Sequence, residues 1–145
     1  MANLLKISEA ASLALHTMSL LAAHPEGRMT IQEMAKALHG SEHHLAKVLR
    51  RLSNAGLVRG TRGPGGGCTL GKPARAISLL QIFESIEGPV GPGHCLLGKR
   101  VCDGKTCVLG GLVTSVQDEV RRYFKKTRLD RLAASFEIAA KARRS

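Results

Sequence analysis

The sequence predicts a mainly α-helical protein with a small β-wing, in which a winged helix-turn-helix precedes a long C-terminal dimerisation helix. Three observations predict this class: two short amphipathic stretches that meet at a tight turn, a glycine-rich loop between two β-prone stretches, and a long helical stretch with one apolar stripe. We expect the winged helix-turn-helix at 1–73, a helix, a cysteine loop (93–107) and the dimerisation helix at 74–136, and a frayed tail at 137–145.

The first two helices are predicted from apolar spacing and from their ends. Apolar residues recur every three or four positions over 4–23, until Pro25 breaks the pattern. Thr30 and Glu33 have the form of a capping box, in which each side chain binds the backbone N–H of the other. They predict the start of a short helix that ends at His39-Gly40.

A third helix follows at once, with Ser41 as its predicted cap. Leu45, Val48 and Leu52 share its inward face, and Asn54 lies near its end. Two helices joined by a tight turn that contains glycine indicate a helix-turn-helix, whose second helix is the recognition helix.

The wing is predicted from short strands at 57–60 and 68–70, which flank the loop at 61–67. Four glycines in this loop let the chain turn sharply. A nucleotide-phosphate cradle is the alternative for a glycine-rich loop, but here no Gly-Lys-Ser/Thr ending follows and no βαβ unit surrounds it.

The second half is predicted to contain a helix over 74–87 and a long helix after the cysteine loop. The long helix carries one apolar stripe: Leu112, Val116, Val120 and Tyr123. A stripe on a helix outside the domain needs a partner, and self-pairing in a two-fold homodimer is the simplest arrangement. A last short helix is expected to start near Thr127.

Composition favours a polyanionic partner in the cytoplasm. The 145 residues carry a formal net charge of +11, and with only four Phe, Tyr and Trp residues the chain has little material for stacking single-stranded bases. Duplex DNA is therefore the expected partner. No apolar run reaches the length of a membrane span and no signal peptide is recognisable, so we expect a cytoplasmic protein without membrane contact.

The DNA contacts are expected on the recognition helix and the wing. The candidates are Ser41, His43, His44, Lys47, Arg50, Arg51, Arg59, Arg62, Gly65 and Gly66. Side chains in the first turns of a recognition helix meet base edges in the major groove, whereas arginines further along contact phosphates. Arg62 in the wing could enter a narrow minor groove. For any one of these charges, the alternative is an ordinary solvated surface.

Three of the four cysteines lie in the loop: Cys95, Cys102 and Cys107. In a cytosolic protein, clustered thiols are more often metal ligands or redox switches than disulfides. Neighbouring basic residues (Lys99, Arg100 and Lys105) favour the thiolate form. Structural zinc and a bare thiol switch are alternatives, and a thiol enzyme is a weaker one because the chain has no CxxC. Cys68, on a predicted strand, is expected to be a small buried residue.

The helix-turn-helix and wing resemble one family closely. The stretch 45–58, followed by Arg62-Gly-Pro-Gly-Gly-Gly67 and Leu70, resembles regulators of the Rrf-two family of the IscR and NsrR type, and the match runs from about Leu4 to Phe136. The resemblance implies a homodimeric transcription factor, often a repressor, that binds a palindromic promoter site. It also implies that an iron–sulfur cluster held by three cysteines controls DNA affinity.

The resemblance leaves the cluster type, [2Fe–2S] or [4Fe–4S], and the fourth ligand open. Positions where relatives place a fourth ligand are occupied here by Ser12 and Gly110. His16, one turn further along the first helix of the partner subunit, is the leading candidate, with His94 and Glu9 next. The signal would be iron, redox or nitric-oxide status. The alternative is a cluster-free regulator that uses zinc, a thiol switch or a protein partner.

Overall fold

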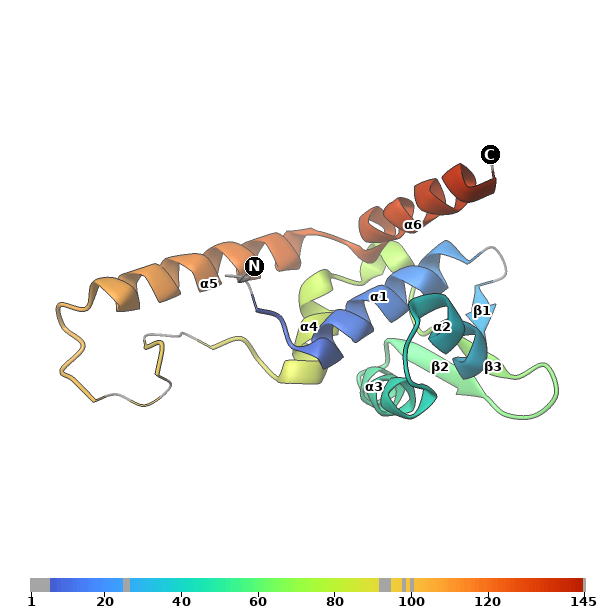
Figure 1. Ribbon diagram of the computed structural model, residues 1–145, viewed down its shortest axis with the longest axis horizontal. Coiled ribbons are helices and arrows are strands. Elements are labelled where there is room, and N and C mark those ends of the chain that lie inside the picture. The colour runs from blue at the N-terminus through green and yellow to red at the C-terminus, as the bar shows by residue number, and fades with distance from the viewer. Residues whose placement is uncertain (1–5, 25–26, 92–94, 98, 100, 145) are drawn as a thin grey trace.

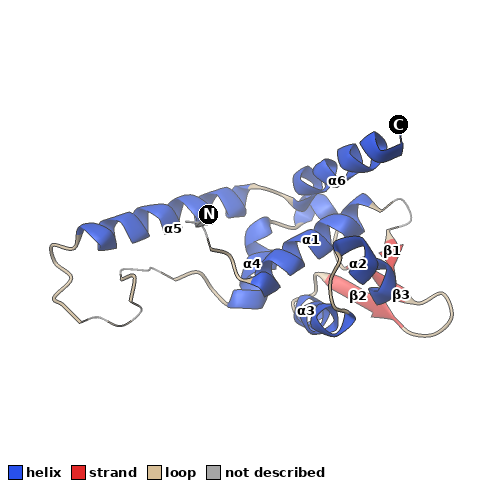
Figure 2. Ribbon diagram, in the orientation of Figure 1, coloured by secondary structure: helices blue, strands red, loops and turns tan. Residues whose placement is uncertain are grey.

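The computed structural model describes residues 6–24, 27–91, 95–97, 99 and 101–144, with side chains described as far as Phe136. The helices form most of the body, a small sheet lies at one end of it, and one long helix extends away at the other end (Figure 1; Figure 2). The elements are α1 (Glu9–Ala23), β1 (Arg28–Met29), α2 (Ile31–Leu38), α3 (Glu42–Asn54), β2 (Val58–Thr61), β3 (Gly67–Leu70), η1 (Ala74–Ala76), α4 (Leu79–Glu87), α5 (Val108–Lys126) and α6 (Leu129–Arg144). The predicted fold class is confirmed.

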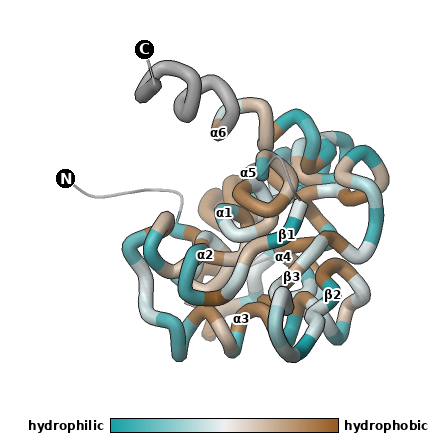
Figure 3. The backbone as a smooth tube through the Cα atoms, turned by 90° about the vertical axis from the view of Figure 1, so that its right-hand side faces the viewer, coloured by the Kyte–Doolittle hydropathy of each residue, from teal (hydrophilic) through white to brown (hydrophobic). Residues whose placement is uncertain are grey.

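α1 is the central helix, and it packs against α3, α4 and α6. Met18 of α1, Leu52 of α3, Ile82 of α4 and Leu129 of α6 have no exposed surface and share one core. The view along α1 in Figure 3 shows its apolar turns in the middle of the molecule. This core joins the expected 1–73 unit to α4 and α6, and the boundary at residue 73 stays a prediction.

The capping predictions in the helix-turn-helix are confirmed. Thr30 and Glu33 form both bonds of the capping box, and the hydroxyl of Ser41 accepts the N–H of His44 at 3.3 Å. His39 ends α2 in the left-handed conformation (φ 53°), which places the backbone N–H of Gly40 against the carbonyl of Ala35.

α1 starts later than the apolar pattern predicts. It begins at Glu9, because the hydroxyl of Ser8 accepts the N–H of Ala11 at 3.0 Å and so caps the helix. The expectation that the helix starts at residue 4 falls partly outside the described residues.

The wing contains one strand more than predicted. β1, β3 and β2 form an antiparallel sheet in that order, with Met29 opposite Cys68 and Gly60 opposite the same residue on the other side. β1 has only two residues, so it gives no periodic signal in the sequence.

The predicted helix over 74–87 is wrong in its first turn. A 3₁₀ turn at Ala74–Ala76 precedes an extended residue, Ile77, and α4 starts only after Ser78, which forms a capping box with Gln81. The backbone of Ile77 and Leu79 pairs with the segment after α5: the N–H of Leu79 donates to Thr127, and the N–H of Leu129 donates to Ile77. This long-range pairing competes with a continuous helix.

α5 and α6 differ in their surroundings. α5 extends away from the body, and α6 folds back along α1 (Figure 1). α6 continues to Arg144 where we expected a short helix and a frayed tail, because its sequence from Ala133 is rich in Ala, Lys and Arg and contains no Gly or Pro. Within the described residues, no helix is long and apolar enough to cross a membrane.

Candidate nucleic-acid interface and cysteine loop

The outer face of α3 presents two of the predicted base-reading side chains, His43 and Lys47, together with the predicted phosphate contact Arg50. His43, Lys47 and Arg50 follow one another at spacings of three and four residues and are exposed. The opposite face of α3 is buried in the core through Leu45, Val48, Leu49 and Leu52. His44 is half-buried beside this core, so the structure separates it from its exposed neighbour His43.

A groove of about 730 Å³ lies between α3, the start of α2 and the wing. His43 and Ala46 line it from α3, and Arg62 and Gly66 line it from the wing. The structure therefore brings one predicted contact of the recognition helix, His43, and two of the wing, Arg62 and Gly66, to one open groove. Ser41 is exposed at the start of the same helix, but its hydroxyl is also used as the helix cap.

The wing turn depends on Gly65 and Gly66. The N–H of Gly66 donates to the carbonyl of Gly63 at 2.8 Å, Pro64 lies at the second position, and Gly65 at the third has φ +75°. This arrangement is that of a type II turn, which requires positive φ at its third residue. A Cβ on Gly66 would lie 2.5 Å from the carbonyl oxygen of Thr61, so only glycine fits there without a backbone shift.

Arg28 is a basic residue of this region that the sequence analysis missed. It lies opposite Thr69, which lies opposite Arg59, so the three side chains share one face of the sheet. Arg28 and Arg59 are exposed, and the buried Met29 and Cys68 occupy the other face. In the sequence, the signal for Arg28 is only that a basic residue directly precedes an apolar one, Met29.

Arg51 differs from the other predicted phosphate contacts because it has a partner within the chain. Its Nη1 donates to the carbonyl oxygen of Ile86, at the C-terminal end of α4, at 3.0 Å. Its neighbour Arg50 is exposed on the outer face of the same helix.

The loop cysteines are free thiols that the structure does not gather. Cys95 is half-buried, Cys102 and Cys107 are exposed, and no group of three His, Cys, Asp or Glu residues is assembled within the described part of the chain. Cys107 has a structural role at the start of α5, where its sulfur accepts the N–H of Gly110 at 3.2 Å and caps the helix. His94 and Arg100 lie outside the described residues.

His16 is exposed on α1, and the small pocket that it lines contains no cysteine. It lines a small pocket with Glu9, Ser12 and Leu13, and its Nδ1 lies 2.7 Å from the carbonyl oxygen of Ser12. Because a carbonyl only accepts, Nδ1 carries the proton, and in the neutral ring Nε2 is left as the possible metal ligand. The edge of its ring also contacts Phe136 of α6, with the centroids 6.2 Å apart.

Cys68 behaves as the sequence predicts. It is buried on β3, and this burial raises the pKa of its thiol. A neutral buried thiol is a poor nucleophile and a poor metal ligand, so Cys68 is chemically distinct from the three loop cysteines.

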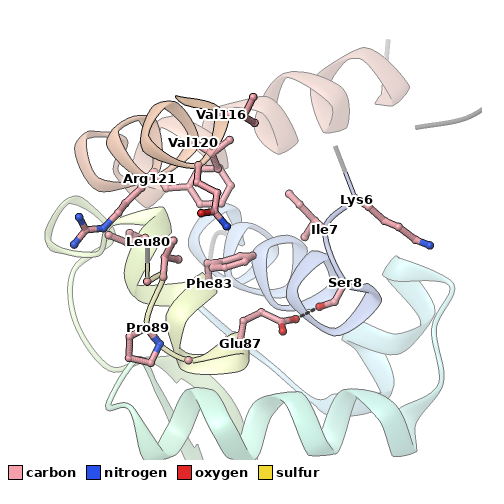
Figure 4. A pocket seen from close by; sticks show the side chains of 15 residues that line it. Lys6, Ile7, Ser8, Leu80, Phe83, Glu87, Pro89, Val116, Val120 and Arg121 are labelled. Atoms are coloured by element: carbon pink, nitrogen blue, oxygen red, sulfur yellow. Dashed lines mark hydrogen bonds between the residues drawn. The ribbon is translucent and has the colours of Figure 1, made fainter. Parts of the chain in front are cut away.

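A pocket of about 480 Å³ lies between α4 and α5, on the inner side of the apolar stripe (Figure 4). Phe83 of α4 and Phe124 of α5 meet edge to face at 5.9 Å and hold the two helices together. Three residues of the apolar stripe are more exposed than these two rings: Leu112 is 57% exposed, Val116 44% and Tyr123 46%.

Comparison with protein families gives one match that covers nearly the whole chain. The family model Rrf2, described as an iron-dependent transcriptional regulator, matches residues 7–135.

Solved structures resemble the chain over most of its length. CymR (YrzC), the global cysteine regulator of B. subtilis, is 32% identical with a TM-score of 0.77, and the match covers 91% of this chain and 98% of that one. The oxidised form of Staphylococcus aureus CymR is 28% identical with a TM-score of 0.71, covering 89% and 96%. IscR of T. potens, at 23% identity and a TM-score of 0.71 over 90% and 88%, shares the fold.

Proposed function

The chain belongs to the Rrf2 family of transcriptional regulators, and on that premise we propose that it binds palindromic promoter DNA as a homodimer, most simply as a repressor. We propose further that the state of the three loop cysteines sets its DNA affinity, and that it works in the cytoplasm, where promoter DNA is accessible. The family and the structural relatives point to a DNA-binding regulator and not to a thiol enzyme.

The single observation that best supports DNA binding is the common surface of α3 and the wing. His43, Lys47 and Arg50 are exposed on the outer face of α3, and His43 and Arg62 line the same groove from α3 and from the wing. The helix would enter the major groove and read base edges, while the wing arginine would lie in the neighbouring minor groove. Arg28 and Arg59 would add phosphate contacts at the base of the wing.

The proposed dimer rests on the exposed stripe of α5. Leu112, Val116 and Tyr123 are exposed at helical spacing on a helix that extends beyond the body of one chain. Pairing two copies of α5 around a two-fold axis would bury these side chains and place two recognition helices on one face. A palindromic site mirrors that symmetry.

The donor set of the loop fits an iron–sulfur cluster in its chemistry. Cys95, Cys102 and Cys107 are free, and thiolates are the usual ligands of such clusters. The sulfur of Cys107 lies at the N-terminus of α5 and accepts the N–H of Gly110. A fourth ligand would come from the partner subunit, for which His16 has an available Nε2. When bound, the cluster supplies a centre sensitive to iron, redox state or nitric oxide.

The residues of this chain then connect the loop to the dimer. Cys107 is both a proposed ligand and the cap of α5, so a change at its sulfur alters the first turn of the proposed dimer helix. A shift in α5 would change the spacing of the two recognition helices relative to the half-sites.

A second candidate keeps the DNA-binding dimer and replaces the cluster by a thiol switch. Two observations favour it: the loop thiols of Cys102 and Cys107 are exposed, and the described residues assemble no metal-binding group. The B. subtilis relative, named as a cysteine regulator, lends it support.

Anaerobic purification with iron, sulfide and zinc analysis separates the two candidates. The proposal predicts a coloured protein with iron and acid-labile sulfide, which Cys95→Ala, Cys102→Ala or Cys107→Ala loses and Cys68→Ala keeps. His16→Ala should leave a cluster with altered spectrum or stability. Protein that holds zinc but neither iron nor sulfide, or no metal at all, contradicts the cluster.

A further inference from the structure

The C-terminal turn of α4 receives its cation from the recognition helix. The last carbonyls of a helix have no partners within it and carry partial negative charge, yet the last turn of α4 contains no basic residue of its own. Arg51 of α3 fills this place, since its Nη1 donates to the carbonyl oxygen of Ile86 at 3.0 Å. The bond joins two segments that are 35 residues apart in sequence.

The position of Arg51 on α3 turns it away from the groove. Arg51 follows His44 and Val48 along the helix, on the flank that packs against α4, whereas His43 and Ala46 line the groove on the other flank. Arg50 and Arg51 are both exposed, but Arg50 makes no intrachain bond among the described contacts, whereas Arg51 is bound to Ile86. The two arginines therefore face different surroundings.

The same turn of α4 also binds two further segments: residues 88–91, which lead toward the cysteine loop, and the segment at Ser8, which precedes α1. The carboxylate of Glu84 accepts the N–H of Val90, on the segment that leads toward Cys95. The carboxylate of Glu87 accepts the hydroxyl of Ser8, which caps α1 (Figure 4). Recognition helix, first helix and the entrance to the loop thus meet at one helical turn.

We propose that Arg51 is a positioning residue that fixes the recognition helix to this turn of α4 and couples it to the cysteine loop, and that it is not a phosphate contact. A movement of the 88–91 segment would reach α3 through the bond between Arg51 and Ile86. The inference about coupling rests on the proposed function, whereas the inference about positioning does not.

The test compares Arg51→Met with Arg50→Met, since both changes remove one charge and keep an apolar stem. Binding to a palindromic duplex, selected in vitro from random sequences, is measured over a range of salt concentrations. Loss of a phosphate contact lowers the slope of log K against log salt by about 0.9. We expect this for Arg50→Met, and we expect Arg51→Met to weaken binding with its slope unchanged.

Hydrogen exchange gives a second readout that does not involve DNA. The N–H of Gly88 donates to Glu84 in the last turn of α4, so its exchange rate reports opening of that turn. Losing a hydrogen bond to a charged group should speed exchange at Gly88 and Val90 by about 10-fold in Arg51→Met and leave it unchanged in Arg50→Met.

A slope lowered by about 0.9 in Arg51→Met, with unchanged exchange at Gly88, would make Arg51 a phosphate contact and overturn the proposal. The coupling is tested by the ratio of DNA affinities with and without bound iron and sulfide, which should move toward one in Arg51→Met. An unchanged ratio contradicts the coupling. If the wild type binds neither iron nor sulfide, the proposed cluster fails, but the salt and exchange measurements still decide the position of Arg51.

Discussion

Replacing Gly66 by Ala should damage the wing and leave the core intact. The new Cβ would lie 2.5 Å from the carbonyl oxygen of Thr61 and 2.8 Å from that of Gly63, and both atoms belong to the backbone. The turn must open, which threatens the bond from Gly66 to Gly63 and the bond from the Thr61 hydroxyl to Gly67. At about 0.5–1.5 kcal/mol for each bond, the local cost is about 1–3 kcal/mol.

This cost should appear mainly in DNA binding, because the turn at 61–67 contributes no residue to the core and carries Arg62. We expect affinity for the selected duplex to fall about 10-fold or more, corresponding to at least ~1.4 kcal/mol. Gly60→Ala is the matched control, since a Cβ there meets nothing within 4 Å. Fluorescence anisotropy measures the affinities, and urea unfolding checks the fold. Equal binding by the Gly66 and Gly60 variants would refute the role of the wing.

The other predictions concern the core, the dimer and two titrating groups. Ile82→Ala empties a site with no exposed surface and should lower the free energy of unfolding by about 2–5 kcal/mol in urea titration. Val116→Glu places a charge in the stripe of α5 and should yield folded monomers in sedimentation, whereas an intact dimer would exclude this interface. The backbone N–H of Thr30 lowers the pKa of Glu33. The melting temperature of wild type should therefore exceed that of Glu33→Gln above the ordinary carboxyl pKa, and this difference should vanish as the pH falls through the lowered pKa of Glu33. A difference in melting temperature that stays constant with pH would argue against this. Because burial raises the pKa of Cys68, alkylation should modify the loop thiols quickly and Cys68 slowly, and equal rates for all four would contradict its burial.

The helix-turn-helix could be predicted from the sequence because its determinants are local. The capping box of Thr30 and Glu33, the cap at Ser41 and the inward stripe of α3 all involve residues within a few positions of one another. Such patterns specify where a helix begins and which face is buried, whatever the rest of the chain does.

Two departures from prediction, at α4 and at β1, come from contacts between distant segments. α4 begins late because Ile77 and Leu79 pair with the backbone after α5, and β1 exists only because β3 lies beside it. Neither partner is visible in local spacing.

In the candidate site too, local spacing predicted some features, and contacts between distant segments determined the others. Sequence spacing identified the outer face of α3 and the wing arginine, but it assigned Arg50 and Arg51 the same role. Only the packing of α3 on α4 separates them, by giving Arg51 the carbonyl of Ile86 as a partner. For His16, the contact with Phe136 likewise depends on α6 folding back over α1.

The measurement that tests the central claim most directly is the DNA affinity of one anaerobic preparation before and after removal of iron and sulfide. If the cysteine loop controls the recognition helices, the Kd of the wild type for its selected duplex should differ between the two states by about 5–150-fold, the range of ordinary coupling energies. Cys102→Ala, whose thiol is exposed and caps no helix, should give the same Kd in both states. A wild-type Kd that is unchanged by removal of iron and sulfide would contradict the claim.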